Sequence, residues 1–96
     1  MSRKGLNNTT EEEKRYLLSF GQCLKALRVN LAKKSLRIFA YETDVPCATL
    51  SRIENGQRIP NLLILKRIAS GFEMTVSELL DKIEKEIPDD IKIFEE

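Results

Sequence analysis

The stretch VPCATLSRIENGQR, residues 45–58, carries most of the information about the fold of this 96-residue chain. Leu50 and Ile53 are three positions apart, which is the spacing of one face of a helix. Asn55-Gly56 supplies the left-handed turn that commonly ends a helix. The outer arc of the same helix holds Cys47, Ala48, Ser51, Arg52 and Asn55. The stretch therefore predicts one short helix with a small, polar outer face.

A second short helix is predicted just before this one. Residues 35–40 contain inward-facing apolar positions, and Ser35 can cap the helix start. A tight connection, residues 43–45, leads to Pro46, which is tolerated in a first turn because that N–H has no helical partner. Two short helices joined by so small a turn form a helix-turn-helix unit, here residues 35–55, whose second helix can enter the major groove of DNA.

Three more helices are predicted around this unit. Their starts are marked by capping residues: Thr10 with Glu13, Asn61, and Thr75 with Glu78. The first helix runs to about Ala32, and its inward positions are predicted to be Leu17, Phe20, Leu24, Leu27 and Leu31. Gly21 lies inside this helix, which predicts close packing against a neighbour there. Pro88 stops the last helix.

The sequence thus predicts an all-α, five-helix domain with an extended first helix. The helix-turn-helix domain spans residues 10–86, after a loose N-terminal arm at residues 1–9. An acidic, amphipathic tail occupies residues 87–96, and within it residues 89–94 fit either a small strand or a partner-binding segment.

Composition excludes several functions. Histidine is absent, so a Ser–His or Cys–His nucleophile is impossible, and we expect no enzyme. The two cysteines, Cys23 and Cys47, fit no zinc spacing and no secreted disulfide framework. No apolar stretch approaches the roughly 20 residues of a membrane span, and no apolar signal core follows the N-terminus. We expect no cofactor, no metal and no membrane association, and a cytoplasmic location.

The net charge of +1 hides a division along the chain. Residues 14–70 hold eleven Lys and Arg against three acids, whereas residues 71–96 hold nine acids against three Lys. A basic region joined to an acidic one is expected when one face of a protein meets phosphate and the other does not. The charge pattern therefore favours a nucleic-acid partner.

A specific set of residues surrounds the run Ser51-Arg-Ile-Glu-Asn-Gly56. Its members are Leu27-Arg28, Ser35-Leu36-Arg37, Phe39-Ala40, Val45, Leu50, Arg58, Pro60, Leu65, Ile68-Ala69 and Glu78-Leu79-Leu80. Through them, residues 20–80 resemble the lambda-repressor-like helix-turn-helix family, the Xre/Cro type of bacterial and phage regulators. The resemblance implies a five-helix domain that binds double-stranded DNA, usually as a two-fold homodimer on a palindromic site.

The resemblance also implies which residues contact DNA. Base contacts are expected from Cys47, Ala48 and Arg52, with Thr49 and Ser51 at the margin. Phosphate contacts are expected from Arg37, Asn55, Gln57 and Arg58. Arg52 can donate two hydrogen bonds to guanine, worth roughly 1–3 kcal/mol against a wrong base. Arg28 and Glu54 are expected to form a structural ion pair between the first and third helices.

The sequence departs from the family pattern at positions that the fold must accommodate. Asp44 stands where the turn usually has glycine, and Glu73 stands where glycine commonly ends the fourth helix. Pro46 replaces the usual Ser or Thr cap. One extra residue must also fit between Arg28 and Ser35. Leu36 also stands where many relatives have Gln, a polar side chain that can bond phosphate. Together the departures leave the DNA-facing side poor in hydrogen-bond donors.

Two functions stay open from the sequence. The first is a sequence-specific DNA-binding regulator, a dimer that represses transcription. The second is a protein-interaction module, such as an antitoxin-like partner, that uses the same scaffold with weak DNA binding. The apolar positions Leu36, Ile38, Leu63 and Ile64 and the tail favour a protein partner, although fold-back of the first helix or the tail would also cover them.

Overall fold

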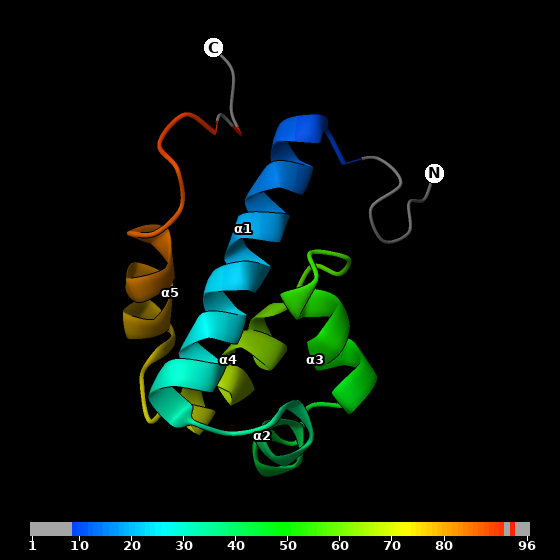
Figure 1. Cartoon of the computed structure of the whole chain (residues 1–96), viewed down its shortest axis with the longest axis vertical. Helices are drawn as coiled ribbons and strands as arrows, with labels where there is room; N and C mark the ends of the chain where they lie inside the picture. Colours follow the sequence, from blue (N-terminus) through cyan, green and yellow to red (C-terminus); the bar gives the residue numbers. More distant parts are fainter. Residues whose placement is uncertain (1–8, 92, 94–96) are drawn as a thin grey trace.

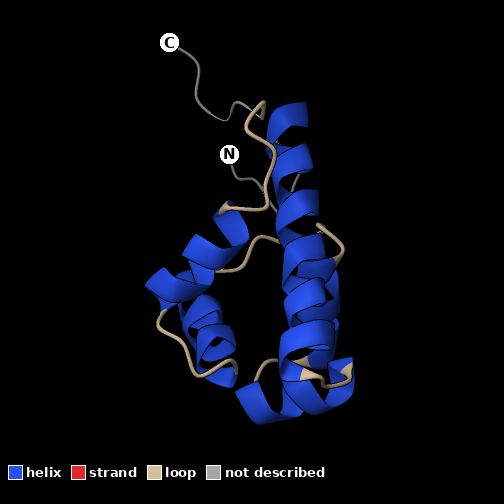
Figure 2. Ribbon diagram, turned by 60° about the vertical axis from the view of Figure 1, so that its left-hand side comes forward, coloured by secondary structure: helices blue, strands red, loops and turns tan. Residues whose placement is uncertain are grey.

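The computed structural model describes residues 9–91 and 93, and in this part of the chain the secondary structure is helical, with no strand (Figures 1 and 2). The α-helices are α1 (Glu11–Leu27), α2 (Leu36–Thr43), α3 (Cys47–Glu54), α4 (Leu62–Gly71) and α5 (Val76–Glu84). In Figure 1, α1 stands between α5 on one side and α3 on the other. The predicted all-α, five-helix fold is confirmed.

Side-chain caps begin four of these five helices, at the predicted residues. Each cap accepts a hydrogen bond from the backbone N–H three residues later: Thr10 from Glu13, Ser35 from Ile38, Asn61 from Ile64, and Thr75 from Glu78. Each such cap is worth about 1 kcal/mol. The exception is α3, which follows Pro46 and has no side-chain cap.

A π-helical turn, η1 (Arg28–Ala32), continues α1. A π-turn holds one more residue than an α-helical turn, so it accommodates the extra residue expected between Arg28 and Ser35. Lys33 then takes a left-handed conformation, φ 56°, and its N–H donates to the Arg28 carbonyl. The prediction that Leu31 faces inward is wrong: Leu31 is 52% exposed, because the wider turn shifts the helical register.

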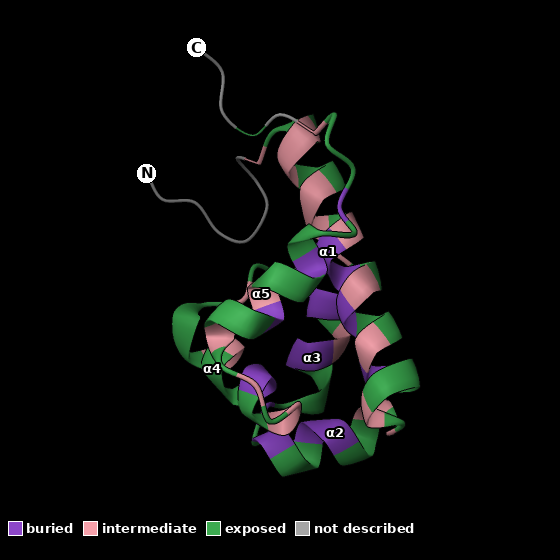
Figure 3. Cartoon of the chain, turned by 90° about the vertical axis from the view of Figure 1, so that its left-hand side faces the viewer, coloured by how far each residue is buried: buried purple, intermediate pink, exposed green. Residues whose placement is uncertain are grey.

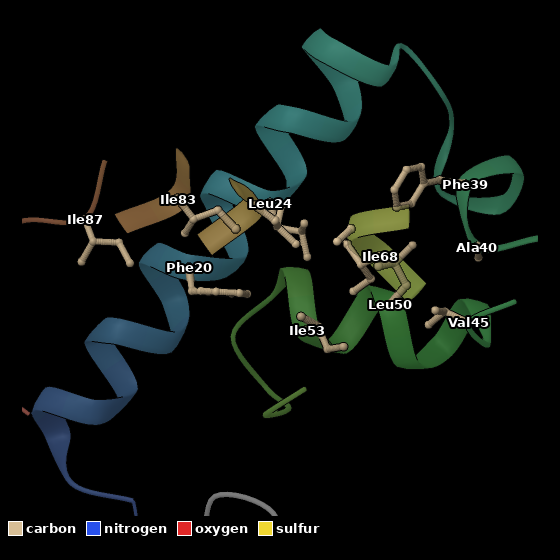
Figure 4. Close-up of a cluster of buried hydrophobic side chains, with 12 residues drawn as sticks. Phe20, Leu24, Phe39, Ala40, Val45, Leu50, Ile53, Ile68, Ile83 and Ile87 are labelled. Carbon is tan, nitrogen blue, oxygen red and sulfur yellow. The ribbon is translucent and has the colours of Figure 1, made fainter. Parts of the chain in front are cut away.

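The hydrophobic core lies where the five helices meet (Figures 3 and 4). The largest fully buried side chains are Phe39, Leu24, Leu50, Ile53, Ile68, Leu79 and Ile83. The ring of Phe72 stacks at a tilt on Phe39, with ring centroids 4.8 Å apart. All of these positions follow the helical spacing of the sequence, so periodicity alone identified the inner face of most helices.

The chain beyond α5 packs beside the first turns of α1. Ile87, which falls in the predicted tail, is only 8% exposed. Tyr16 Oη donates a hydrogen bond to the Glu84 carboxylate, and Arg15 Nη2 pairs with Asp90 Oδ2 at 3.3 Å. Partial burial, together with the bond to Glu84, raises the pKa of Tyr16 to about 12. The tail thus continues the fold through residue 91.

The predicted surplus of surface apolar residues divides into two groups. Leu36 and Ile64 are half-buried and pack against the core. Ile38 and Leu63 stay 51% and 69% exposed. For residues 89–94, the alternative of a strand does not appear at 89–91 or 93, and the other two residues lie outside the described part. The core therefore covers only some of these apolar positions.

Candidate nucleic-acid interface

The turn between α2 and α3 sets the angle of the second helix. Asp44 occupies a left-handed position, φ 58°, and its N–H bonds to carbonyls in the last turn of α2. Val45 N–H donates to the Ala40 carbonyl at 3.1 Å. From α4, Arg67 Nη1 donates to the Asp44 carbonyl at 3.3 Å. A short polar residue tolerates the left-handed conformation, so the predicted helix-turn-helix unit forms without the glycine.

α3 has one buried side and one exposed side. Leu50 and Ile53 are 0% and 1% exposed and fix the helix to the core. On the opposite arc, Cys47, Ala48 and Arg52 are exposed and Ser51 is half-buried. Thr49 differs from this expectation: it is 8% exposed, because its position on the helix lies beside Leu50 and Ile53 rather than on the outer arc. Thr49 is therefore removed from the set of base-contacting residues.

A buried ion pair holds the C-terminal end of α3. Arg28 Nε and Nη2 donate to the two carboxylate oxygens of Glu54 at 2.7 and 2.9 Å, and Arg28 Nη1 donates to the Lys34 carbonyl at 2.9 Å. The bond to Glu54 raises the pKa of Arg28 above its usual value. The predicted pair is confirmed, and one guanidinium connects η1, the residues before α2, and α3.

Two glycines bring backbone into direct contact with backbone. A Cβ atom on Gly21 of α1 would lie 2.3 Å from the Glu54 carbonyl oxygen, which confirms the predicted close packing. Gly56 has φ +73°, and a Cβ there would lie 2.8 Å from Leu18 Cα. The end of α3 and the turn after it therefore lie flush against α1.

Unpaired arginines lie on α3, in the helix before it and in the turn after it. Arg37, Arg52 and Arg58 are all exposed, and within the described residues none of them makes a hydrogen bond or an ion pair with the protein. Guanidinium groups left free in this way are available to phosphate and base edges. Asn55 and Gln57, the other expected phosphate contacts, are also exposed.

Sequence reasoning did not single out one further cation, at the end of η1. Lys33 is exposed and also unpaired among the described residues, and it lies two residues before the Ser35 cap of α2. The extra residue expected between Arg28 and Ser35 could have drawn attention to Lys33. It is accommodated by η1, and Lys33 is the exposed, left-handed residue that ends η1. Lys33 therefore joins the candidates for phosphate contact.

Clustered metal ligands and a membrane-spanning helix are both lacking among the described residues. Its residues contain no group of three or more His, Cys, Asp or Glu that could hold a metal ion. None of its helices is long and apolar enough to cross a membrane. Cys23 and Cys47 are free thiols, the first half-buried and the second exposed.

A tight helix pair, an outward-facing second helix and free arginines around it define a helix-turn-helix DNA-binding domain. The sequence model of the helix-turn-helix family matches residues 24–79, more than half of the chain. The chain belongs to this family, whose members of the lambda-repressor-like type bind DNA and regulate transcription.

Known relatives support the assignment. The chain is 41% identical over 69 residues to the control protein C.MunI from Mycoplasma sp., covering 72% of this chain and 93% of that one. The solved structure of the restriction-modification controller protein C.AhdI from Aeromonas hydrophila is 29% identical, with 67% and 96% covered and a TM-score of 0.59. An HTH_3 family transcriptional regulator from Vibrio cholerae is also 29% identical, with 82% and 47% covered and a TM-score of 0.63.

Proposed function

We propose that this chain is a sequence-specific, dimeric regulator of transcription that controls a restriction-modification system. The observation that best supports a DNA-binding surface is a set of exposed arginines that have no partner among the described residues: Arg37, Arg52 and Arg58. Elsewhere, most arginines are engaged: Arg28 with Glu54, Arg15 with two acids, and Arg67 with a backbone carbonyl. The similarity to C.MunI and C.AhdI supports the controller role.

The two kinds of DNA contact fall to different residues. Cys47, Ala48 and Arg52, with Ser51 at the margin, face the base edges. Arg52 reads guanine, and the small side chains make apolar contact with a thymine methyl group. Asn55, Gln57, Arg58, Arg37 and Lys33 contact phosphates, which position the protein without reading sequence. One arginine therefore carries most of the base recognition.

Arg52→Ala and Arg58→Ala are expected to weaken DNA binding in different ways. Loss of Arg52 removes a base contact, so binding to the preferred site falls by roughly 1–3 kcal/mol and recognition broadens. Loss of Arg58 removes a phosphate contact, so the protein binds all sequences more weakly. A plot of the logarithm of the binding constant against the logarithm of the salt concentration becomes less steep by about 1. Selection from a pool of random duplexes, then titration at several salt concentrations, measures both.

Lys82→Ala provides the matched control for this experiment. It removes the same charge from α5, which lies on the other side of α1 from α3 (Figure 1), and it is expected to change neither affinity nor preference. Absence of salt-sensitive binding by the wild-type chain would contradict the regulator function. Repression is tested separately, by expressing the chain with a reporter promoter that carries the selected sequence in the cytoplasm of a bacterial host.

The dimer surface is proposed at the start of α4. Ile59, Leu62 and Leu63 are 54%, 69% and 69% exposed and lie within five residues of one another. A two-fold dimer must place two recognition helices about 34 Å apart on one face of DNA, so its interface has to flank α3 rather than oppose it. The beginning of α4 follows α3 directly in the chain and meets this requirement, and a second copy would cover the apolar side chains.

Leu63→Asp is expected to convert the dimer to a monomer. A carboxylate in a small apolar interface would be desolvated without a partner, and two such charges would meet across the two-fold axis. Light scattering measures the mass, and titration with a palindromic site should show weaker binding. Val29→Asp, which alters an apolar residue of η1 that is 48% exposed, is the control and should stay dimeric. A wild-type monomer, or a dimeric Leu63→Asp variant, would contradict the proposed surface.

A further inference from the structure

The first turns of α1 lie outside the region that matches the family, which begins at residue 24. We call residues 11–23 the α1 extension. It has a neighbour on each of two sides: the turn after α3 on one side, and the segment that follows α5 on the other (Figure 1). The extension therefore connects the acidic C-terminal part of the chain with residues next to the proposed phosphate contacts.

On the first side, the contact is backbone against backbone. A Cβ on Gly56 would lie 2.8 Å from Leu18 Cα and 3.1 Å from Leu18 N. A Cβ on Gly21 would lie 2.3 Å from the Glu54 carbonyl oxygen. Side chains can rotate to absorb a small shift of a neighbour, but backbone atoms in direct contact cannot. A displacement of the extension is therefore transmitted to residues 54–56, and from there to Gln57 and Arg58.

On the second side, residues 84–90 hold the extension in place. Tyr16 donates to the Glu84 carboxylate, and Arg15 pairs with Asp90. Ile87 is buried in the same cluster as Phe20 of α1 (Figure 4). Ile87 is the strongest of these contacts, because it is 8% exposed whereas the two polar contacts lie at the surface and are worth little each.

We propose that residues 84–90 position the phosphate-contacting turn, residues 55–58, by holding the α1 extension against it. The inference rests on the proposed DNA-binding function and adds to it a segment that affects DNA affinity from a distance. The segment does not touch DNA, because it is acidic and lies against the side of α1 away from α3. Ile87 is thus a positioning residue for Arg58.

Ile87→Ala tests the proposal through DNA binding. Loosening the extension is expected to weaken binding about three- to tenfold, the usual size of such indirect effects. The dependence of the logarithm of the binding constant on the logarithm of the salt concentration should become less steep by about 1, because the affected contact is a phosphate contact. The base preference recovered from random duplexes should not change. Measurements are made well below the unfolding midpoint of each variant, with circular dichroism as the check on folding.

A double-mutant cycle separates positioning from general loss of stability. In an Arg58→Ala background, Ile87→Ala should have little further effect on affinity, because the contact that it positions is already gone. Val76→Ala is the matched control: it truncates a half-buried apolar residue of α5 and should leave affinity and salt slope unchanged. If Ile87→Ala does not fold, Ile87→Val, which trims the same buried side chain by one methyl group, replaces it in the same cycle.

The outcomes distinguish this proposal from the proposed function. If wild-type protein binds DNA but Ile87→Ala has wild-type affinity and slope, the positioning role is wrong and the regulator function stands. Equal effects of Ile87→Ala and Val76→Ala, or full additivity with Arg58→Ala, would also overturn it. If the wild-type chain fails to bind duplex DNA, the proposed function itself is wrong.

Discussion

Glu54→Ala is expected to lower the free energy of unfolding by about 3–5 kcal/mol. The substitution leaves the Arg28 guanidinium in the interior, where the residue is 6% exposed, without its carboxylate partner. An unpaired buried charge costs far more than the small net gain of an intact pair. Typical domains are stable by only about 5–15 kcal/mol, so the loss would remove a large fraction of the total stability. Urea unfolding measured by circular dichroism tests this.

The double variant Arg28→Met/Glu54→Leu is the control for that experiment. Replacing both partners by apolar residues removes the stranded charge, so most of the lost stability should return. Recovery is expected to be incomplete, because Arg28 also donates to the Lys34 carbonyl. A Glu54→Ala variant within about 1 kcal/mol of wild type would be no worse than an average point substitution and would show that the pair does not hold α3.

Gly21→Ala is expected to destabilise the protein by about 2–3 kcal/mol. Helix propensity alone predicts the opposite, a gain of about 1 kcal/mol, because alanine is the better helix former. The added Cβ would lie 2.3 Å from the Glu54 carbonyl oxygen and 2.5 Å from that of Ile53, so α1 and α3 must separate. Thermal unfolding measures the change, and DNA binding should weaken with it because α3 moves.

Gln22→Ala is the matched control, since Gln22 is the next residue of α1 and is exposed. It changes helix propensity without touching α3, so its stability should lie close to that of wild type. A Gly21→Ala variant as stable as this control would mean that the two helices can separate at no cost, contrary to the close contact of their backbones.

The DNA-facing side could be predicted only in part. The sequence placed Cys47, Ala48 and Arg52 on the outer arc of α3, and all three are exposed. Thr49, expected at the margin of the base contacts, is buried, because exposure at the margin of an eight-residue helix depends on how the helix rotates against its neighbours. Exposure of Arg37 and Arg58 followed from the pattern, but only the structure shows that no carboxylate of the described residues neutralises them.

The sequence by itself determined where the helices begin and which faces are apolar. A capping box needs only a Thr and a Glu three residues apart, and a helix face needs only apolar residues at helical spacing. Thr10, Ser35, Asn61 and Thr75 could therefore be identified as caps without knowledge of the rest of the molecule. The residues that specify each helix start therefore lie within about one helical turn of one another in the sequence.

Tertiary structure alone decided how distant segments meet. The hydrogen bond of Tyr16 to Glu84 joins residues 68 positions apart, and the backbone of Gly56 lies against that of Leu18. Local spacing does not encode such contacts, because they result from the joint packing of all five helices in one small core. For the same reason the free cations around α3, and the link from the C-terminal segment to the phosphate-contacting turn, appear only in the folded chain.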